Sequence, residues 1–518
     1  METYRAPTSG PDDRYRPIYH FTPPEQWMND PNGLVYLDGE YHLFYQHYPD
    51  SNVWGPMHWG HAVSRDLLAW RHLPIALTPD SLDYVYSGSA VVDRANAAGF
   101  AEADQPPPLI AVYTVHDVGA ERAGRDDYES QAIAYSLDRS RTWTAYAGNP
   151  VLPNPDPPMR DFRDPNVHWD GAAQRWVMAL AVHDRIGFYA SHDLKSWTPL
   201  SDWGTGIGAH GGVWECPDLF ALTDEATGES HDVLLVSVNN GGPNGGSATQ
   251  YFVGEFSSGR FSLDDAFAKR LAREGAQWID YGRDNFAGVT WSNIPADDGR
   301  RLFLGWMSNW GYADDVPTTT WRGAMTVPRT LHLASASEGP RLRAQPVAEL
   351  QQLRSDSLQI PAGSIDDELP LVIAGELPLE AAELLLEIDL AASDADEIAL
   401  VLANAWGEEF RLGYDRAADA LFTDRRTAGP TDFSPYFATD RHTAPRVSES
   451  DTLALHVLLD RTSVELFADD GLTAITDIAF PTEPWTTATL TTEGGTARLL
   501  ACTAYSIKAP KPAQQITK

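Results

Sequence analysis

A short motif that recurs three times constrains the fold of this chain more than any other feature of its sequence. Each copy is a Ser and an Asp two residues apart, followed four or five residues later by a Trp. The copies are Ser64-Arg-Asp66-Leu-Leu-Ala-Trp70, Ser136-Leu-Asp138-Arg-Ser-Arg-Thr-Trp143 and Ser191-His-Asp193-Leu-Lys-Ser-Trp197. Ser and Asp bond to the backbone of their own turn, and the Trp packs between sheets. Because each copy lies between two strand-like stretches, the repeat indicates the blades of a β-propeller.

Short strands separated by turns fill the rest of the first two thirds of the chain. Residues 34–37 and 41–45 flank Asp38-Gly39, which is a strong signal for a hairpin. Residues 176–182 and 233–238 are apolar enough to be buried strands. Helical periodicity is nearly absent, so we predict an all-β fold.

The composition changes near residues 335–350. Residues 333–340 are rich in small residues and read as a linker, and Trp becomes rare beyond them. Alternating stretches such as residues 384–390 and 452–459 predict a β-sandwich of ordinary domain size. We therefore predict a catalytic β-propeller over residues 1–340 and a β-sandwich over residues 341–518.

The net charge of −35 limits the partners of the chain. A strongly acidic surface repels nucleic acid and anionic lipid but is compatible with a neutral substrate, so we expect neither a nucleic-acid nor a membrane partner.

Only two cysteines, Cys216 and Cys502, are present, which excludes a disulfide framework or a Cys-based zinc site. The start of the chain has no apolar core of a secretory leader, so we expect a cytoplasmic protein or a mature secreted form.

Three carboxylates lie in apolar, aromatic or Pro-containing surroundings. Burying a charge there costs free energy, so such a carboxylate often has a function. Asp30 lies between a Trp and a Pro-Asn-Gly turn, Asp164 follows Arg163 and precedes a Pro, and Glu215 lies between Trp and Cys-Pro. Singly, each has a structural alternative, as a turn former or as half of an ion pair. Cleavage of a glycosidic bond commonly uses two carboxyl groups, one as acid and base and the other as nucleophile.

Together these segments resemble glycoside hydrolase family 32, which contains invertases, inulinases, levanases and related fructosyltransferases. The match is strong over about residues 17–330 and looser beyond them. The motifs that carry it are Trp27-Met-Asn-Asp-Pro-Asn-Gly33, Phe44-Tyr-Gln-His-Tyr-Pro49, Trp59-Gly-His-Ala-Val-Ser-Arg-Asp66, Ser87-Gly-Ser-Ala90, Arg163-Asp-Pro165, Glu215-Cys-Pro217, Gly305-Trp-Met-Ser-Asn-Trp310 and Trp321-Arg-Gly-Ala-Met-Thr-Val-Pro-Arg329.

The resemblance implies a five-bladed propeller with a central funnel-shaped site, followed by a β-sandwich. It implies that Asp30 is the nucleophile, that Glu215 is the acid/base and that Asp164 binds the sugar hydroxyls and stabilises the transition state. The residues it implies for the fructose pocket are Asn29, Gln46, Trp54, Ser87, Arg163 and Trp306. It implies a retaining β-fructofuranosidase acting on sucrose or fructans, with transfer to sugar acceptors at high substrate concentration. The chemistry requires no metal or cofactor.

One position departs from the family pattern. Tyr86 precedes the Ser-Gly-Ser motif where family members often carry Trp or Phe, so its hydroxyl adds a polar group to the pocket. We expect Arg163 to favour the ionised form of its neighbour Asp164.

Two other classes of protein compete with this interpretation. A sialidase would need a Tyr nucleophile and a set of arginines, which the sequence does not offer. A propeller lectin would bind fructan without cleaving it, and incubation with sucrose separates that alternative. The sequence does not reveal the preferred fructoside or the oligomeric state.

Overall fold

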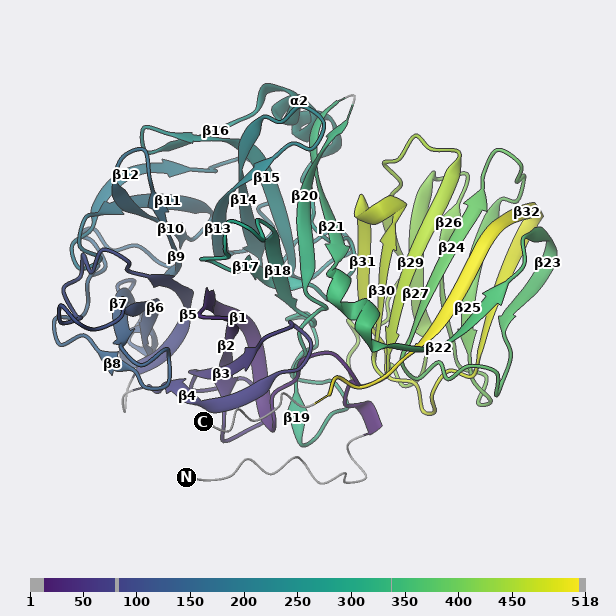
Figure 1. Cartoon of the computed structure of the whole chain (residues 1–518), viewed down its shortest axis with the longest axis horizontal. Helices are drawn as coiled ribbons and strands as arrows, with labels where there is room; N and C mark the ends of the chain where they lie inside the picture. The colour runs from purple at the N-terminus through teal and green to yellow at the C-terminus, as the bar shows by residue number, and fades with distance from the viewer. Residues whose placement is uncertain (1–13, 80–82, 337, 512–518) are drawn as a thin grey trace.

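The computed structural model describes residues 14–79, 83–336 and 338–511, and these form a five-bladed β-propeller and a β-sandwich (Figure 1). Blade one contains β1 (Gln26–Leu37), β2 (Glu40–Tyr48), β3 (His58–Ser64) and β4 (Arg71–Leu77), with β19 (Trp321–Arg322) added parallel to β1. Blade two contains β5 (Asp83–Val92), β6 (Leu109–Asp117), β7 (Glu129–Ser136) and β8 (Thr144–Ala145). Blade three contains β9 (Phe162–Asp170), β10 (Arg175–Val182), β11 (Arg185–Ser191) and β12 (Thr198–Trp203).

The last two blades complete the propeller. Blade four contains β13 (Trp214–Thr223), β14 (Ser230–Val238), β15 (Ala248–Ser257) and β16 (Arg260–Leu263). Blade five contains β17 (Phe286–Thr290), β18 (Arg301–Trp306), β20 (Arg329–Ala336) and β21 (Gly339–Pro346). The described α-helices are α1 (Val118–Arg122) and α2 (Asp265–Glu274), and no helix in the described part is long and apolar enough to cross a membrane. The predicted all-β fold and the five blades are confirmed.

The repeated motif forms the turn between the third and fourth strands of blades one, two and three. In blade one, Ser64 Oγ donates to Asp66 Oδ1 at 2.9 Å, and that carboxylate accepts two backbone N–H groups of the turn. Trp70 Nε1 donates to the carbonyl of Leu67 at 3.1 Å. The copies in blades two and three have the same Ser–Asp bond, at 2.8 and 3.1 Å. The turn chemistry expected from the sequence is therefore what ends each of these strands.

The hairpin predicted at Asp38-Gly39 is present, whereas the predicted linker is not. Asp38 and Gly39 both have positive φ, 50° and 85°, as a two-residue turn between β1 and β2 requires. Residues 333–336 lie instead in β20 and residues 339 and 340 in β21, the outer strands of blade five. The small residues Ala334, Ser335 and Ala336 are part of a strand, and β21 crosses the predicted boundary at residue 340, so that division stays a prediction.

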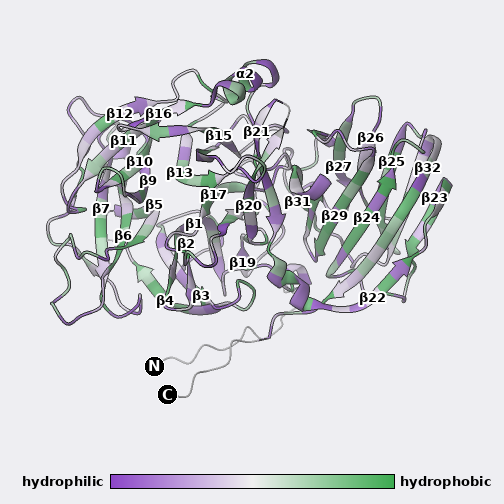
Figure 2. Cartoon of the chain, turned by 45° about the horizontal axis from the view of Figure 1, so that its top comes forward, coloured by the Kyte–Doolittle hydropathy of each residue, from purple (hydrophilic) through white to green (hydrophobic). Residues whose placement is uncertain are grey.

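The sandwich has two layers that share one long strand, β32 (Thr487–Ile507). The C-terminal half of β32 pairs with β24 and the N-terminal half with β25, so the strand passes from one layer to the other. The other strands are β22 (Arg354–Ile360), β23 (Gly363–Val372), β24 (Ala382–Asp389), β25 (Glu397–Ala403), β26 (Glu409–Asp415), β27 (Ala420–Thr427), β28 (His442–Pro445), β29 (Thr452–Asp460), β30 (Ser463–Ala468) and β31 (Thr473–Ile478). Two 3₁₀ turns, η2 (Ala348–Leu353) and η3 (Asp469–Gly471), complete the described elements. Figure 2 shows hydrophobic residues concentrated on the strands of both domains.

Buried ion pairs join the propeller to the sandwich. Arg329 at the start of β20 donates to Asp280 at 2.8 Å and to Glu465 of β30 at 2.7 Å, and all three side chains are buried. Arg425 of β27 donates to Asp284 at 2.6 Å, again with both side chains fully buried. Removing one member of such a pair leaves a buried charge uncompensated, so the two domains are held in a fixed arrangement.

Candidate active site

The innermost strand of every blade loses its regular register near the residue where it begins. The interruptions lie between Met28 and Pro31 in β1, Val85 and Gly88 in β5, Arg163 and Asn166 in β9, Glu215 and Asp218 in β13, and Phe286 and Val289 in β17. Such bulges redirect side chains, and they accommodate the Pro that follows Asp30, Asp164 and Cys216. Asp164 and Cys216 adopt positive φ values of 62° and 45°, a conformation that non-Gly residues rarely adopt outside functional sites.

The bulges bring the three predicted carboxylates into one cavity of about 270 Å³. This volume is near the lower end for ligand pockets, about 300 Å³, and is suited to a small sugar. The thiol of Cys216 lies 3.5 Å from Asp30 Oδ2 and 3.7 Å from Asp164 Oδ2, so it joins two of the carboxylates. The cavity is lined by Asn29, Asp30, Gln46, Trp54, Tyr86, Ser87, His116, Glu121, Tyr128, Glu129, Asp161, Arg163, Asp164, Glu215 and Trp310.

Asp30 is buried and is surrounded by neutral hydrogen-bond donors. Ser87 Oγ donates to Asp30 Oδ2 at 2.7 Å, and Asn29 Nδ2 donates to Oδ1 at 3.0 Å. Trp27 Nε1 donates to the side-chain oxygen of Asn29 at 2.7 Å, which orients the amide toward the carboxylate. Burial raises the pKa of Asp30, and the bonds from Ser87, Asn29 and Cys216 lower it, with a net increase. These donors fix the orientation of the carboxylate, and no cation among the described residues pairs with it, as suits an attacking group.

Asp164 is buried among like charges. Burial raises the pKa of Asp164 to about 8, Arg163 lowers it, and the charges of Glu215 and Asp30 raise it further. The guanidinium of Arg163 donates to Glu215 and to other acids, while Asp164 Oδ2 accepts the backbone N–H of Cys216 at 3.0 Å. Arg163 therefore favours the ionised form of Asp164, as expected, but burial and the neighbouring carboxylates outweigh this one cation.

Glu215 shares the cation of Arg163 with two further acids. Arg163 Nη2 donates to Glu215 Oε1 at 2.8 Å, and Nη1 contacts Asp161 at 2.8 Å and Glu129 at 3.2 Å. Burial raises the pKa of Glu215, Arg163 lowers it and the charge of Asp30 raises it, with a net increase. A carboxyl group with a raised pKa, held by a directional donor, can carry a proton to a leaving group.

The other predicted pocket residues divide into two layers. Asn29, Gln46, Trp54 and Ser87 line the cavity, and Trp54 is 39% exposed at its rim. Trp306 does not line it: the side chain is fully buried, with its ring centroid 4.8 Å from that of Trp310. Trp310 occupies the wall that we predicted for Trp306.

Besides Tyr86 and Trp310, five lining residues were not among the predicted site residues: His116, Glu121, Tyr128, Glu129 and Asp161. His116 connects two of them, with Nδ1 3.3 Å from Glu129 and Nε2 3.1 Å from Glu121 on α1. His116 also stacks on Tyr86, with ring centroids 4.4 Å apart. Asp161 could have been found from its place two residues before Arg163, whereas His116 and Glu121 lie in no motif that we recognised.

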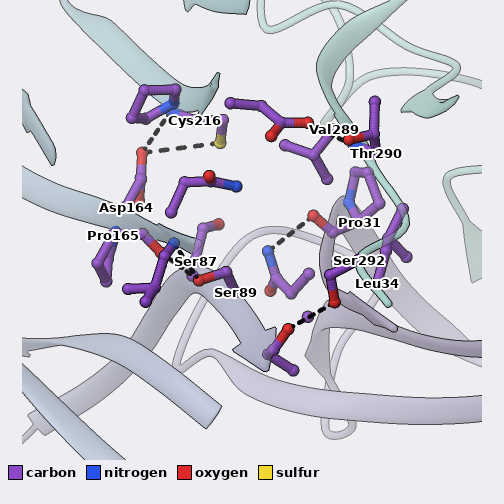
Figure 3. Close-up of a pocket in the computed structure, with 18 of the residues that line it drawn as sticks. Pro31, Leu34, Ser87, Ser89, Asp164, Pro165, Cys216, Val289, Thr290 and Ser292 are labelled. Carbon is purple, nitrogen blue, oxygen red and sulfur yellow. Dashed lines mark hydrogen bonds between the residues drawn. The ribbon is translucent and has the colours of Figure 1, made fainter. Parts of the chain in front are cut away.

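A second, narrower cavity of about 60 Å³ continues from the floor of the first along the propeller axis. The two cavities share Ser87 and Asp164, and Figure 3 shows the backbone nitrogen and sulfur of Cys216 directed at Asp164 from this side. The lower cavity has room for water molecules but not for a sugar. Polar groups thus contact the carboxylates from the lower cavity, and a sugar has room only in the upper one.

Comparison with known proteins gives matches along nearly the whole chain. The model of the glycosyl hydrolases family 32 N-terminal domain matches residues 20–346, and the model of the family's C-terminal domain matches residues 349–506. A levanase of Bacillus subtilis (strain 168) is 47% identical over 92% of this chain and 68% of that protein. A levanase of Bacillus sp. (strain L7) is 38% identical over 96% of this chain, which spans 52% of that protein.

Fungal proteins match over their full length. An extracellular exo-inulinase of Aspergillus awamori is 36% identical over 96% of this chain and 95% of that protein. The crystal structure of exo-inulinase from the same organism has a TM-score of 0.86 at 34% identity and covers 96% of this chain and 98% of that one. A β-fructofuranosidase from Schwanniomyces occidentalis, solved with fructosyl-erythritol, has a TM-score of 0.83 at 27% identity, with the same coverage.

Proposed function

This chain belongs to glycoside hydrolase family 32, and from that premise we propose that it releases terminal, non-reducing β-fructofuranosyl units from sucrose and fructans. It is a glycoside hydrolase, and its similarity to levanases and exo-inulinases supports a fructan or sucrose substrate. Membership of the family removes the sialidase alternative. The observation that carries the proposal is the meeting of three buried carboxylates with Arg163 in a sugar-sized cavity.

We infer a double displacement in which Asp30 attacks the anomeric carbon while Glu215 protonates the leaving oxygen. The neutral donors Ser87 and Asn29 orient Asp30, and its lone pairs are not committed to a cation. The raised pKa of Glu215 keeps a proton available for the leaving group. Glu215 then removes a proton from the incoming water, which cleaves the fructosyl ester. Asp164 binds sugar hydroxyls, as a donor when protonated and as an acceptor when ionised.

The acceptor in the second step is either water or another sugar. Trp54, Tyr86 and Trp310 line the outer part of the cavity, and aromatic faces hold sugar rings and raise their local concentration. We propose measurable transfructosylation at high sucrose, with hydrolysis prevailing in dilute substrate. The exo-inulinase relatives are named as extracellular, and we propose secretion for this protein as well.

Product analysis with sucrose, inulin and levan, each with and without lactose, tests the proposal. We expect free fructose from at least sucrose and one fructan, and new oligosaccharides when lactose is present at high sucrose. NMR of the first-formed fructose should show the β anomer, because two inversions give net retention. Binding without release of sugar would indicate a lectin and refute the function, whereas an α anomer would refute only the double displacement.

A further inference from the structure

A loop of the sandwich presents one strongly exposed aromatic ring. Tyr436 lies in the loop of residues 428–441, between β27 and β28, and is 62% exposed. The next residue, Phe437, is buried against Tyr312 of the propeller, with ring centroids 5.1 Å apart. The loop is therefore packed onto the propeller, and the exposed ring of Tyr436 contributes little to that packing.

Tyr436 stands beside the wall of the sugar cavity. A methyl group added at Gly311 would lie 3.8 Å from the Cβ of Tyr436. Gly311 follows Trp310, which lines the cavity. The sandwich thus places an exposed aromatic ring next to the residue that follows Trp310 of the cavity wall.

The backbone under this ring is held from both domains. Arg283 of the propeller donates to the carbonyl of Tyr436, and Arg425 Nε donates to the carbonyl of Phe437 at 2.9 Å. The guanidinium of Arg425 also lies over the ring of Phe437, 3.9 Å from its centroid. A ring on a fixed backbone loses only side-chain freedom when a ligand stacks on it. Its contact therefore contributes more to affinity than the same contact on a flexible loop would.

We propose that Tyr436 is an outer sugar platform that binds fructosyl units of a fructan beyond those inside the cavity. The inference rests on the proposed function. A cavity of about 270 Å³ holds the end of the chain, so the remainder of a polymer must leave over the rim. The apolar face of a fructosyl ring stacks on the Tyr ring, and the phenol hydroxyl bonds to sugar hydroxyls. Sucrose has only one fructosyl unit, which the cavity holds, so we expect it not to depend on this ring.

Steady-state kinetics of Tyr436→Ala and Tyr436→Phe, on sucrose and on the better of levan and inulin, test the platform. One aromatic stacking contact corresponds to a change in KM of about three- to tenfold. We expect Tyr436→Ala to raise KM for the fructan by this factor, with its kcat and both constants for sucrose unchanged. Tyr436→Phe keeps the ring and should stay within about twofold of the wild type.

Trp169→Ala is the matched control. Trp169 is 44% exposed at the end of β9 remote from Arg163 and Asp164, so its removal should change neither substrate's KM. An unchanged fructan KM in Tyr436→Ala would overturn the proposal. So would an equal rise for sucrose and fructan, because it would show that the loop only supports the cavity wall. Failure of the wild type on all fructosides would instead overturn the proposed function.

Discussion

Replacing His20 with Gln should lower the free energy of unfolding by about 3 kcal/mol near pH 6, and this deficit should vanish toward pH 10. His20 is fully buried between two carboxylates, with Nδ1 2.8 Å from Asp460 and Nε2 2.8 Å from Glu465. Glu465 also pairs with Arg329, so the histidine belongs to the network that joins the N-terminal segment, the propeller and the sandwich.

The magnitude follows from the pKa of His20, which is raised from 6.5 to about 9. Burial lowers this pKa, but the bonds and charges of Asp460 and Glu465 raise it by more. A folded-state pKa above the unfolded value means that the native state binds the proton more tightly. The stabilisation is therefore complete below pH 6.5 and is lost as the pH rises through about 9. At 1.36 kcal/mol per pKa unit, the difference corresponds to about 3 kcal/mol.

Urea unfolding of the wild type and His20→Gln between pH 5.5 and pH 10 measures this deficit. The control is His332→Gln, because His332 pairs with Glu225 at 2.7 Å but both side chains are partly exposed. Such surface pairs contribute about 0–1 kcal/mol, so we expect a small effect. A His20→Gln deficit that is constant with pH, or that grows toward pH 9, would refute the reasoning, since it would show that the imidazole is neutral in the native state.

Three further predictions concern the carboxylates and their cation. Asp30→Asn should reduce kcat by at least about 10³-fold with the fold intact, because the attacking charge is lost, and near-normal turnover of sucrose would contradict this role. Glu215→Gln should nearly abolish sucrose cleavage, but it should retain more activity on a fructoside with an activated leaving group, which needs less protonation. Added azide should then give fructosyl azide. Equal loss of activity on both substrates would argue against Glu215 as the acid/base. Arg163→Gln should move the alkaline limb of the kcat/KM profile to higher pH, because Arg163 lowers the pKa of Glu215, whereas Arg163→Lys should move it less.

The repeat and the hairpin were readable from the sequence because their chemistry is local. Ser64 and Asp66 close their own turn, and Asp38-Gly39 has the backbone preferences that a two-residue turn needs. The segment at residues 333–340 misled the prediction because its small residues have little strand propensity of their own. Only the pairing of residues 333–336 with residues 339–342 identifies the strand.

The sequence singled out candidate site residues that have an unusual neighbour in the chain, and it missed lining residues whose neighbours come from other blades. Asp30 and Glu215 became candidates because an aromatic residue and a Pro lie close to each of them. The partners of Arg163 across the cavity, Glu215 and Glu129, could not be read from the chain because they lie on other strands. Trp306 was implied for the pocket by the family resemblance, which does not show that Trp310 lines the cavity in this chain.

The same geometry explains why two domains are needed for one small site. The bulges of β1, β5, β9 and β13 each add one or two side chains to a common cavity, although the four strands are far apart in sequence. The wall formed by Trp310 is not part of such a strand and needs another support. Tyr312, two residues further, donates to Asp284 at 2.6 Å and accepts from Arg425 of the sandwich at 2.8 Å. Arg425 therefore fixes the loop that carries Trp310, and the sandwich holds this wall of the cavity in place.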